Sequence, residues 1–252
     1  MALNQASGED GTRLARHDIA AGAVAQVLLL ALLAGTVGLG PAGRLTGLVF
    51  AVGTWVLLIR ALRRARPGPF GPANRVTLAR ATLVGGVTAL VADSLDGPPR
   101  VAALAALAGV ALILDAVDGL VARRTGTVSE LGARFDMEVD AFLILVLSVY
   151  VSARLGVWVL LIGLMRYGFV AAARVLPWLN APLTPSTARK SVAALQGVAL
   201  LAAATYLPRP LTLPVILLAL TTLTWSFGRD IHTLHRTRPL RDPTPRESAT
   251  VG

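Results

Sequence analysis

Long apolar runs, separated by short polar or Gly/Pro-containing segments, dominate the chain. A membrane-spanning helix needs about 17 to 25 apolar residues, and eight runs approach or reach that length. Turn residues such as Gly40-Pro41 and Gly97-Pro98-Pro99 separate them. The expected spans are 19–39, 45–62, 76–92, 101–121, 133–153, 157–176, 191–207 and 211–227. The pattern predicts an all-α integral membrane protein with about eight transmembrane helices.

Polar residues concentrate at the two ends of the chain and between the spans. Residues 1–17 are expected to form a flexible cytoplasmic segment, and residues 229–252 a basic, disordered cytoplasmic tail. Residues 60–80 carry six Arg around three Pro, and we expect this segment, with Arg80 at its end, to lie at the cytoplasmic surface.

The amino-acid composition also indicates a membrane protein. Of the 252 residues, 54% are hydrophobic and 15% charged, which excludes an ordinary soluble domain. The net charge of +10 comes mostly from Arg beside the spans, where it sets topology and meets anionic lipid, so nucleic acid is not an expected partner. No Cys is present, so metal ligands must be oxygen or nitrogen.

The distribution of Arg predicts the orientation in the membrane. The expected outer turns hold one Arg each, and the expected inner segments hold nearly all the others. The positive-inside rule therefore places both termini in the cytoplasm. Among the 24 basic residues, 23 are Arg, as is typical of a GC-rich bacterial genome, so we expect a bacterial inner or plasma membrane.

Four carboxylates lie within apolar sequence at helical spacing. Asp115 and Asp118 are three residues apart, and Asp136 and Asp140 are four apart, so each pair shares a helix face. The loop between the two spans brings both pairs to one membrane side. Carboxylate oxygens suit hard cations, and a pair of such ions can assist a phosphoryl displacement. The sequence therefore predicts a divalent-metal site facing the cytoplasm.

The first acidic pair belongs to a longer pattern, Asp115-x-x-Asp118-Gly119-x-x-Ala122-Arg123, followed by Gly132-x-x-x-Asp136-x-x-x-Asp140. Gly119 and Ala122 leave one helix face open to a ligand or a second backbone. Isolated membrane acids more often pair with Arg or line a proton path, but four acids do not fit that explanation easily.

This pattern resembles the signature of the CDP-alcohol phosphotransferases, membrane enzymes that join a CDP-linked group to an alcohol and release CMP. The resemblance extends loosely from about Asn74 to about Trp225. It implies a six-helix catalytic core within residues 63–228, preceded by two extra spans in residues 18–62. It also implies a CDP-diacylglycerol-type donor, a small alcohol acceptor, two Mg²⁺ or Mn²⁺ ions and a homodimer in the lipid membrane.

The resemblance implies roles for individual residues. Asp115, Asp118 and Asp136 would be metal ligands, and Asp140 a ligand and the general base. The residues implied to receive the CDP moiety, or to pack beside it, are Asp118, Gly119, Ala122, Arg123, Gly132 and Thr77.

Thr77 belongs to a spacing of its own. Asn74, Thr77 and Arg80 recur every three residues and share one helix face, where family members often carry similar residues. The same residues are also ordinary at a helix start, with Asn as a cap and Arg reaching the interface.

The acceptor is expected to be a phosphorylated polyol, because cations beyond Arg123 enter the same cytoplasmic half of the core. These candidate acceptor-binding residues are Arg134, Arg166, Arg189 and Lys190. A structural ion pair is the rival explanation for Arg166. We expect Glu138, which faces away from the Asp pair on its helix, to pair with an Arg.

Two other functions fit part of the pattern. A cation- or proton-coupled transporter would explain intramembrane Asp and Arg residues as relays. A membrane prenyltransferase also uses Asp-rich helices and magnesium. Neither explains Gly119, Ala122 and Arg123 at their spacing after Asp118.

Overall fold

A computed structural model of the chain describes residues 2–64, 72–125, 130–181, 186–205 and 207–236, and these are helical except for short connections. No strand occurs in these ranges. The long helices are α1 (Ala2–Thr36), α2 (Pro41–Arg64), α3 (Pro72–Asp96), α4 (Val101–Thr125), α5 (Glu130–Leu155), α6 (Leu160–Val175), α7 (Thr187–Ala204) and α8 (Arg209–Arg236).

The helices end where the sequence removes helical geometry or hydrogen bonding. Gly38, between α1 and α2, has φ 68°, and Gly156, after α5, has φ 104°, values that favour glycine. Pro41 and Pro72 begin α2 and α3, where a missing N–H is harmless. A single turn of 3₁₀ helix, Val157–Val159, leads into α6.

Two helices are longer than their sequences predict. α1 begins at Ala2, so residues 2–17 are helical where a flexible segment was expected, and no Pro interrupts the chain before Pro41. α8 continues to Arg236, past the expected tail boundary at residue 229. Its last turn holds His235 and Arg236, and positive charge is favourable at this end of a helix.

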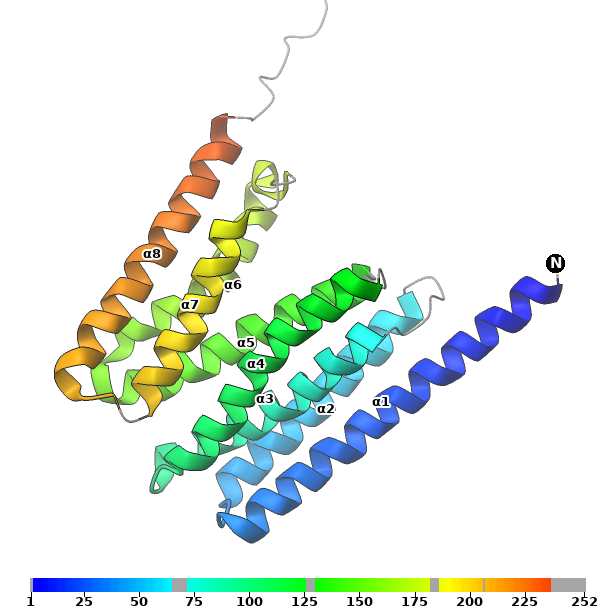
Figure 1. The fold of residues 1–252 in the computed structure, drawn as a ribbon, viewed down its shortest axis with the longest axis horizontal. Helices are drawn as coiled ribbons and strands as arrows, with labels where there is room; N and C mark the ends of the chain where they lie inside the picture. Colours follow the sequence, from blue (N-terminus) through cyan, green and yellow to red (C-terminus); the bar gives the residue numbers. More distant parts are fainter. Residues whose placement is uncertain (1, 65–71, 126–129, 182–185, 206, 237–252) are drawn as a thin grey trace, which may run out of the picture.

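The helices form one layered bundle organised around α3 and α5 (Figure 1). α3 packs against α1, α2, α4 and α5, while α5 also packs against α6 and α7, and α7 against α8. In Figure 1, α6 to α8 are inclined relative to α1 to α5. A continuous apolar core joins the two groups, with Val87 of α3, Leu147 of α5 and Leu200 of α7 fully buried.

The described residues contain four helical segments long and apolar enough to cross a membrane. These are Pro41–Ala61, Asn74–Asp96, Val157–Val175 and Pro210–Arg236. Two shorter apolar helical segments are Ala20–Thr36 and Val101–Val117. The all-α integral membrane fold is therefore confirmed.

α1 and α2 are joined to the core at the lower end of the bundle in Figure 1. There Arg100, just before α4, donates hydrogen bonds to Asp93 Oδ2 at 2.7 Å and to the backbone carbonyls of Val37 at 2.5 Å and Gly38 at 2.7 Å. Asp93 Oδ1 accepts a hydrogen bond from the Gly40 N–H at 2.8 Å. One ion pair thus ties the α1–α2 turn to α3 and α4.

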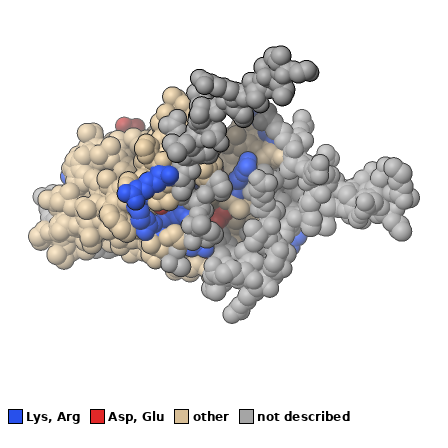
Figure 2. Space-filling model, turned by 90° about the horizontal axis from the view of Figure 1, so that it is seen from above, with Lys and Arg blue, Asp and Glu red and all other residues tan. Residues whose placement is uncertain are grey.

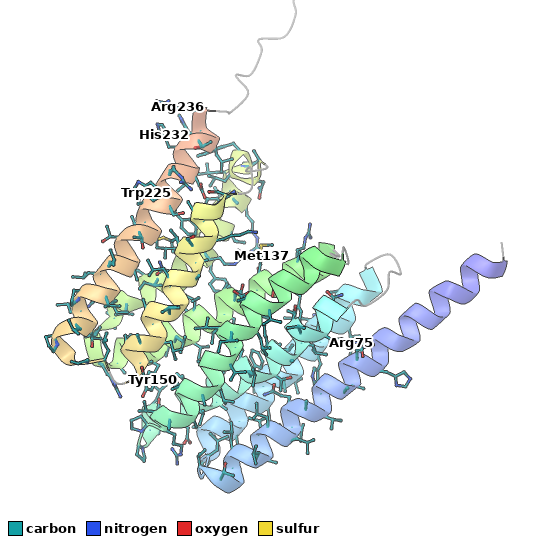
Figure 3. The ribbon with its side chains drawn as sticks, in the orientation of Figure 1. Arg75, Met137, Tyr150, Trp225, His232 and Arg236 are labelled. Carbon is teal, nitrogen blue, oxygen red and sulfur yellow. The ribbon has the colours of Figure 1, made fainter. Side chains whose placement is uncertain are left out.

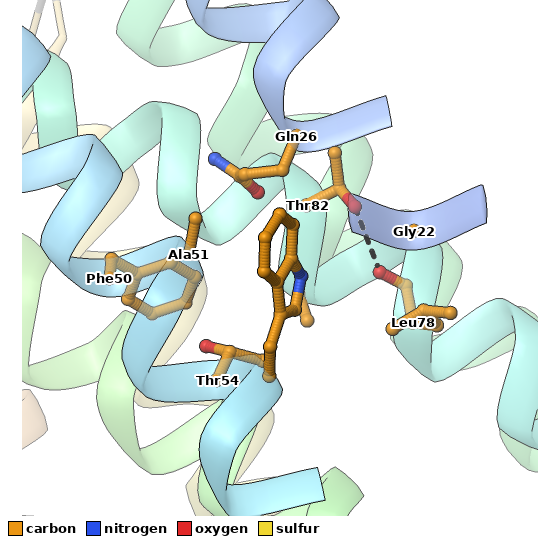
Figure 4. A pocket seen from close by; sticks show the side chains of 9 residues that line it. Gly22, Gln26, Phe50, Ala51, Thr54, Leu78 and Thr82 are labelled. Carbon is orange, nitrogen blue, oxygen red and sulfur yellow. Dashed lines mark hydrogen bonds between the residues drawn. The ribbon is translucent and has the colours of Figure 1, made fainter. Parts of the chain in front are cut away.

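A shallow cleft lies higher up between α1, α2 and α3 (Figure 4). Gln26, which is buried, lines it together with Thr54 and Thr82, and the Gln26 Nε2 group has no hydrogen-bond partner among the described residues. Thr82 donates its hydroxyl hydrogen bond to the Leu78 carbonyl instead. The lining contains no carboxylate, so this cleft is separate from the acidic residues described next.

Candidate metal centre

The polar face of α3 points into the bundle. Asn74, Thr77 and Arg80 are all buried, with exposed fractions of 6%, 3% and 1%. The prediction that they share one helix face is confirmed. The prediction that Arg80 lies at the cytoplasmic surface is wrong, because its side chain is buried. A charge at this depth needs a partner, because an unpaired buried guanidinium is costly.

Arg80 meets three of the four predicted carboxylates. Its Nη1 atom lies 3.1 Å from Asp115 Oδ1 and also donates to Asp136 Oδ1. Its Nη2 atom donates to Asp140 Oδ1. The Arg comes from α3, Asp115 from the second half of α4, and Asp136 and Asp140 from the first half of α5. Three helices therefore converge on one polar cluster.

The carboxylates lie at one end of the bundle. Met137 is near the upper end of α5 and Tyr150 near its lower end, so Asp136 and Asp140, on either side of Met137, belong to the upper half (Figure 3). The prediction that the acidic residues of two successive helices meet is confirmed for Asp115, Asp136 and Asp140. The side chain of Asp118 lies outside the described part of the structure.

Among the described residues, carboxylates outnumber cations in this cluster. Three carboxylates face one guanidinium, and the Asp side chains are 30–40% exposed whereas the Arg80 side chain is 1% exposed. Arg80 thus lies beneath the carboxylates, which are accessible from the other side. Carboxylate oxygens of the three Asp residues lie within 4.8 Å of one another. Oxygen donors this close suit a hard divalent cation such as Mg²⁺, so the residues fit a metal.

The other residues predicted for the CDP moiety lie beside this cluster in the chain. Gly119, Ala122 and Arg123 belong to the last part of α4, but their side chains are outside the described structure. Gly132 is in the first turn of α5 and partly buried. Their roles therefore stay predictions.

At least two of the four predicted acceptor-binding cations have carboxylate partners. Arg166 of α6 donates to Glu138 Oε1 at 2.6 Å, so the prediction that Glu138 pairs with an Arg is confirmed. Arg189 of α7 lies 3.6 Å from Asp230 of α8. The positive charges of Arg166 and Arg189 are therefore not surplus charges that an acceptor phosphate would have to neutralise.

The remaining two predicted cations, Arg134 and Lys190, are exposed. Lys190 forms no ion pair within the residues that the structure describes. Seen from above, Lys and Arg side chains gather on this end of the molecule around small areas of Asp and Glu (Figure 2). The upper face thus combines cations with carboxylates.

Arg80 is the residue of this cluster that sequence reasoning missed. It was grouped with the Arg-rich segment 60–80, although it stands eight residues after Pro72, two turns inside α3. The signal was its spacing from Asn74 and Thr77, which placed it on the inward face. Asp93 was missed because a single acid near a helix end predicts no particular partner.

Fold and site together define a multi-pass membrane protein with a carboxylate cluster suited to a divalent cation. The family model for CDP-alcohol phosphatidyltransferase matches residues 71–226, and the chain belongs to this family. The match starts just before α3 and ends within α8, so it includes every member of the cluster and omits α1 and α2. Neither the curated proteins nor the solved structures gave a match.

Membership makes the protein a membrane transferase of the CDP-alcohol phosphotransferase type, connected with phospholipid biosynthesis. The family is metal-dependent and uses CDP-alcohol donors and alcohol acceptors within a membrane. The resemblance seen in the sequence is thereby confirmed.

Proposed function

We propose that the protein transfers a phosphatidyl or similar phospho-group from a CDP-linked lipid to an alcohol and releases CMP. The observation that carries this proposal is the meeting of Asp115, Asp136 and Asp140 at the end of a membrane bundle. Such a reaction depends on positioning and charge neutralisation, so it needs no Ser or Cys nucleophile. The family match supports the reaction type.

Four Asp side chains would hold the metal, namely Asp115, Asp118, Asp136 and Asp140. Two Mg²⁺ or Mn²⁺ ions, when bound, supply charge neutralisation to the donor's pyrophosphate. Arg123, with Gly119 and Ala122 leaving room on α4, binds the CDP part of the donor.

Asp140 accepts the proton of the acceptor hydroxyl as the general base. The acceptor oxygen then bonds to the lipid-bearing phosphorus, and the bond from that phosphorus to the CMP oxygen breaks. CMP leaves with the electron pair of that bond, and the proton stays on the Asp140 carboxyl until solvent removes it. The partial exposure of Asp140, 40% of its side chain, is compatible with this role.

We propose a phosphorylated polyol as the acceptor, for example glycerol 3-phosphate or inositol phosphate. The support is Arg134 and Lys190, both exposed on segments that lead into the upper end of the core. Arg166 and Arg189 could take part only if an acceptor phosphate competes with Glu138 and Asp230 for them.

We also propose that the carboxylate cluster faces the cytoplasm of a bacterial cell and that both termini lie on that side. Single-cysteine labelling tests this in a chain without native Cys. Labels at Gly97 and Arg209 should react from outside the cell, and a label at Gly126 only after permeabilisation. The opposite pattern would refute the orientation. A homodimer stays a prediction.

The experiment for the reaction is CMP release from CDP-diacylglycerol by purified protein in lipid vesicles. Each of glycerol 3-phosphate, inositol 1-phosphate, inositol, serine and choline is offered separately, with Mg²⁺ or with a chelator. We expect Mg²⁺-dependent CMP release with one of the phosphorylated acceptors. Release with serine or free inositol alone would overturn the acceptor proposal, and no release with any acceptor would contradict the donor assignment.

A further inference from the structure

Arg80 pairs with the same carboxylates that the proposed reaction needs as metal ligands. Its two terminal nitrogens engage Asp115, Asp136 and Asp140, the same three residues whose oxygens are grouped closely enough to hold a cation. Arg cannot lose its proton in a protein. A divalent cation at these carboxylates would therefore meet a fixed positive charge already bound to them.

Two cations on one set of carboxylates repel each other and divide the available oxygens. A neighbouring positive charge typically lowers the affinity of a carboxylate for protons by about ten- to a thousandfold. The same electrostatic effect acts on metal ions. Arg80 should therefore weaken metal binding to this cluster, although it stabilises the cluster in the absence of metal.

We propose that Arg80 is an internal counterion that competes with the divalent metal for Asp115, Asp136 and Asp140, and that the phosphate groups of the donor take over its charge when metal binds. The proposal rests on the metal centre of the proposed function. Arg80 therefore acts through the carboxylates in the absence of donor and contacts a donor phosphate once metal is bound.

The transfer to a phosphate follows from the burial of Arg80. Its side chain is 1% exposed, so a guanidinium that lost its carboxylates would be left charged in a poorly solvated site. The donor's pyrophosphate is an anion that matches the planar fork of a guanidinium. Metal without donor draws the charge of the three carboxylates away from Arg80, whereas metal together with donor supplies Arg80 with a phosphate in their place. Binding of the two ligands is therefore cooperative, and part of this coupling depends on Arg80.

A purely structural Arg80 predicts different behaviour. If it only held α3, α4 and α5 together, its removal would loosen the carboxylates and weaken metal binding. The competition predicts the opposite sign, so a direct measurement of metal affinity separates the two roles.

The test measures Mn²⁺ binding to the full chain in detergent, from the paramagnetic resonance signal of free Mn²⁺, with and without CDP. The proteins are wild type, Arg80→Gln and Arg80→Lys. Arg75→Gln is the matched control, because Arg75 lies on the same helix but pairs with Asp18 at 3.1 Å, away from the cluster. It removes one positive charge from α3 without touching the three carboxylates.

Without CDP, we expect Arg80→Gln to bind Mn²⁺ about tenfold tighter than wild type, or more, and Arg75→Gln to bind as wild type does. Addition of CDP should strengthen Mn²⁺ binding to wild type more than to Arg80→Gln. Arg80→Lys keeps the charge on a shorter side chain without the forked contacts, so its affinity should lie in between. If Arg80→Gln does not fold, the comparison of Arg80→Lys with wild type carries the test.

Unchanged or weaker Mn²⁺ binding by the Arg80 variants, with normal binding by wild type, would overturn the competition and leave the metal centre intact. A gain of equal size in Arg75→Gln would also overturn it, because the effect would then be general charge. If neither wild type nor the variants bound Mn²⁺, the metal centre itself would fail, and the competition with it.

Discussion

The two ends of α3 each hold an Arg–Asp cluster, and their difference separates a structural site from a chemical one. At the lower end, Arg100 has one carboxylate partner, Asp93, and satisfies its other donors with backbone carbonyls. The Asp93 side chain is only 9% exposed and also accepts the Gly40 N–H. This pair is electrically balanced and its hydrogen bonds stay within the protein.

At the upper end, Arg80 serves three carboxylates that are 30–40% exposed. Among the described residues, three carboxylates share this one guanidinium, and the carboxylates are accessible from one side. Like charges this close are unfavourable unless a further cation joins them. A group of accessible carboxylates around one Arg therefore indicates a site that binds a ligand, whereas an Arg–Asp pair whose hydrogen bonds stay within the protein indicates a site that holds helices together.

The lower cluster also gives α1 and α2 a physical connection to the part of the chain that matches the family model. Arg100 and Asp93 lie within residues 71–226, whereas Val37, Gly38 and Gly40 precede them. The α1–α2 pair is thus fixed to α3 at the end opposite the carboxylate cluster. Asp93 and Arg80 are 13 residues apart, about 20 Å along the helix.

The largest expected effect is on turnover at the upper cluster. Asp140→Asn should lower the rate of CMP release by about 10²–10⁴-fold, because the general base is lost. Binding of CDP in the presence of Mg²⁺ should persist, since the other Asp residues remain. Steady-state kinetics and a CDP binding isotherm measure the two quantities. A turnover close to that of wild type would show that another group takes the proton.

The next effect is on stability at the lower cluster. Arg100→Gln should destabilise the fold by about 2–4 kcal/mol, because it leaves the Asp93 charge without its partner and three carbonyls without their donor. Arg75→Gln, which breaks the exposed pair with Asp18, should cost under about 1 kcal/mol. Thermal unfolding in detergent compares the two. Equal losses of stability in both variants would show that the Arg100–Asp93 pair stabilises the fold no more than an exposed ion pair does.

The smallest expected effect concerns the acceptor. Lys190→Ala should raise the acceptor KM several-fold and leave the donor KM nearly unchanged, because Lys190 is exposed at the start of α7 and forms no ion pair among the described residues. Initial rates at varied concentrations of each substrate give both constants. A rise confined to the donor KM would show that Lys190 binds the donor and not the acceptor.

The fold could be predicted largely from apolar run length and from Gly and Pro positions. All eight expected spans correspond to helices, because apolar runs bounded by breakers have few alternatives, and four of the described helical segments are long and apolar enough to cross a membrane. The ends of α1 and α8 were missed because polar residues extend a helix readily when no Pro stops them. Hydropathy does not detect such extensions.

The carboxylate cluster could be predicted because its residues lie on two successive helices joined by one loop, so that spacing alone placed Asp115 near Asp136 and Asp140. The partners of Arg80, Arg100 and Arg166 could not, because each pair joins helices whose relative rotation depends on packing. For the same reason the sequence overestimates the number of cations available to an acceptor, since Arg166 and Arg189 pair with carboxylates on other helices.

The most direct test of the central claim compares two isosteric substitutions, Asp93→Asn and Asp136→Asn. Each removes the charge of one carboxylate that pairs with an Arg, at opposite ends of α3. The measurement is the rate of Mg²⁺-dependent CMP release per mole of folded protein. We predict that Asp93→Asn keeps the wild-type rate despite a lower unfolding temperature, and that Asp136→Asn loses nearly all activity while staying folded. Equal loss in both variants, or full activity in Asp136→Asn, would contradict the assignment of the upper cluster as the reactive site.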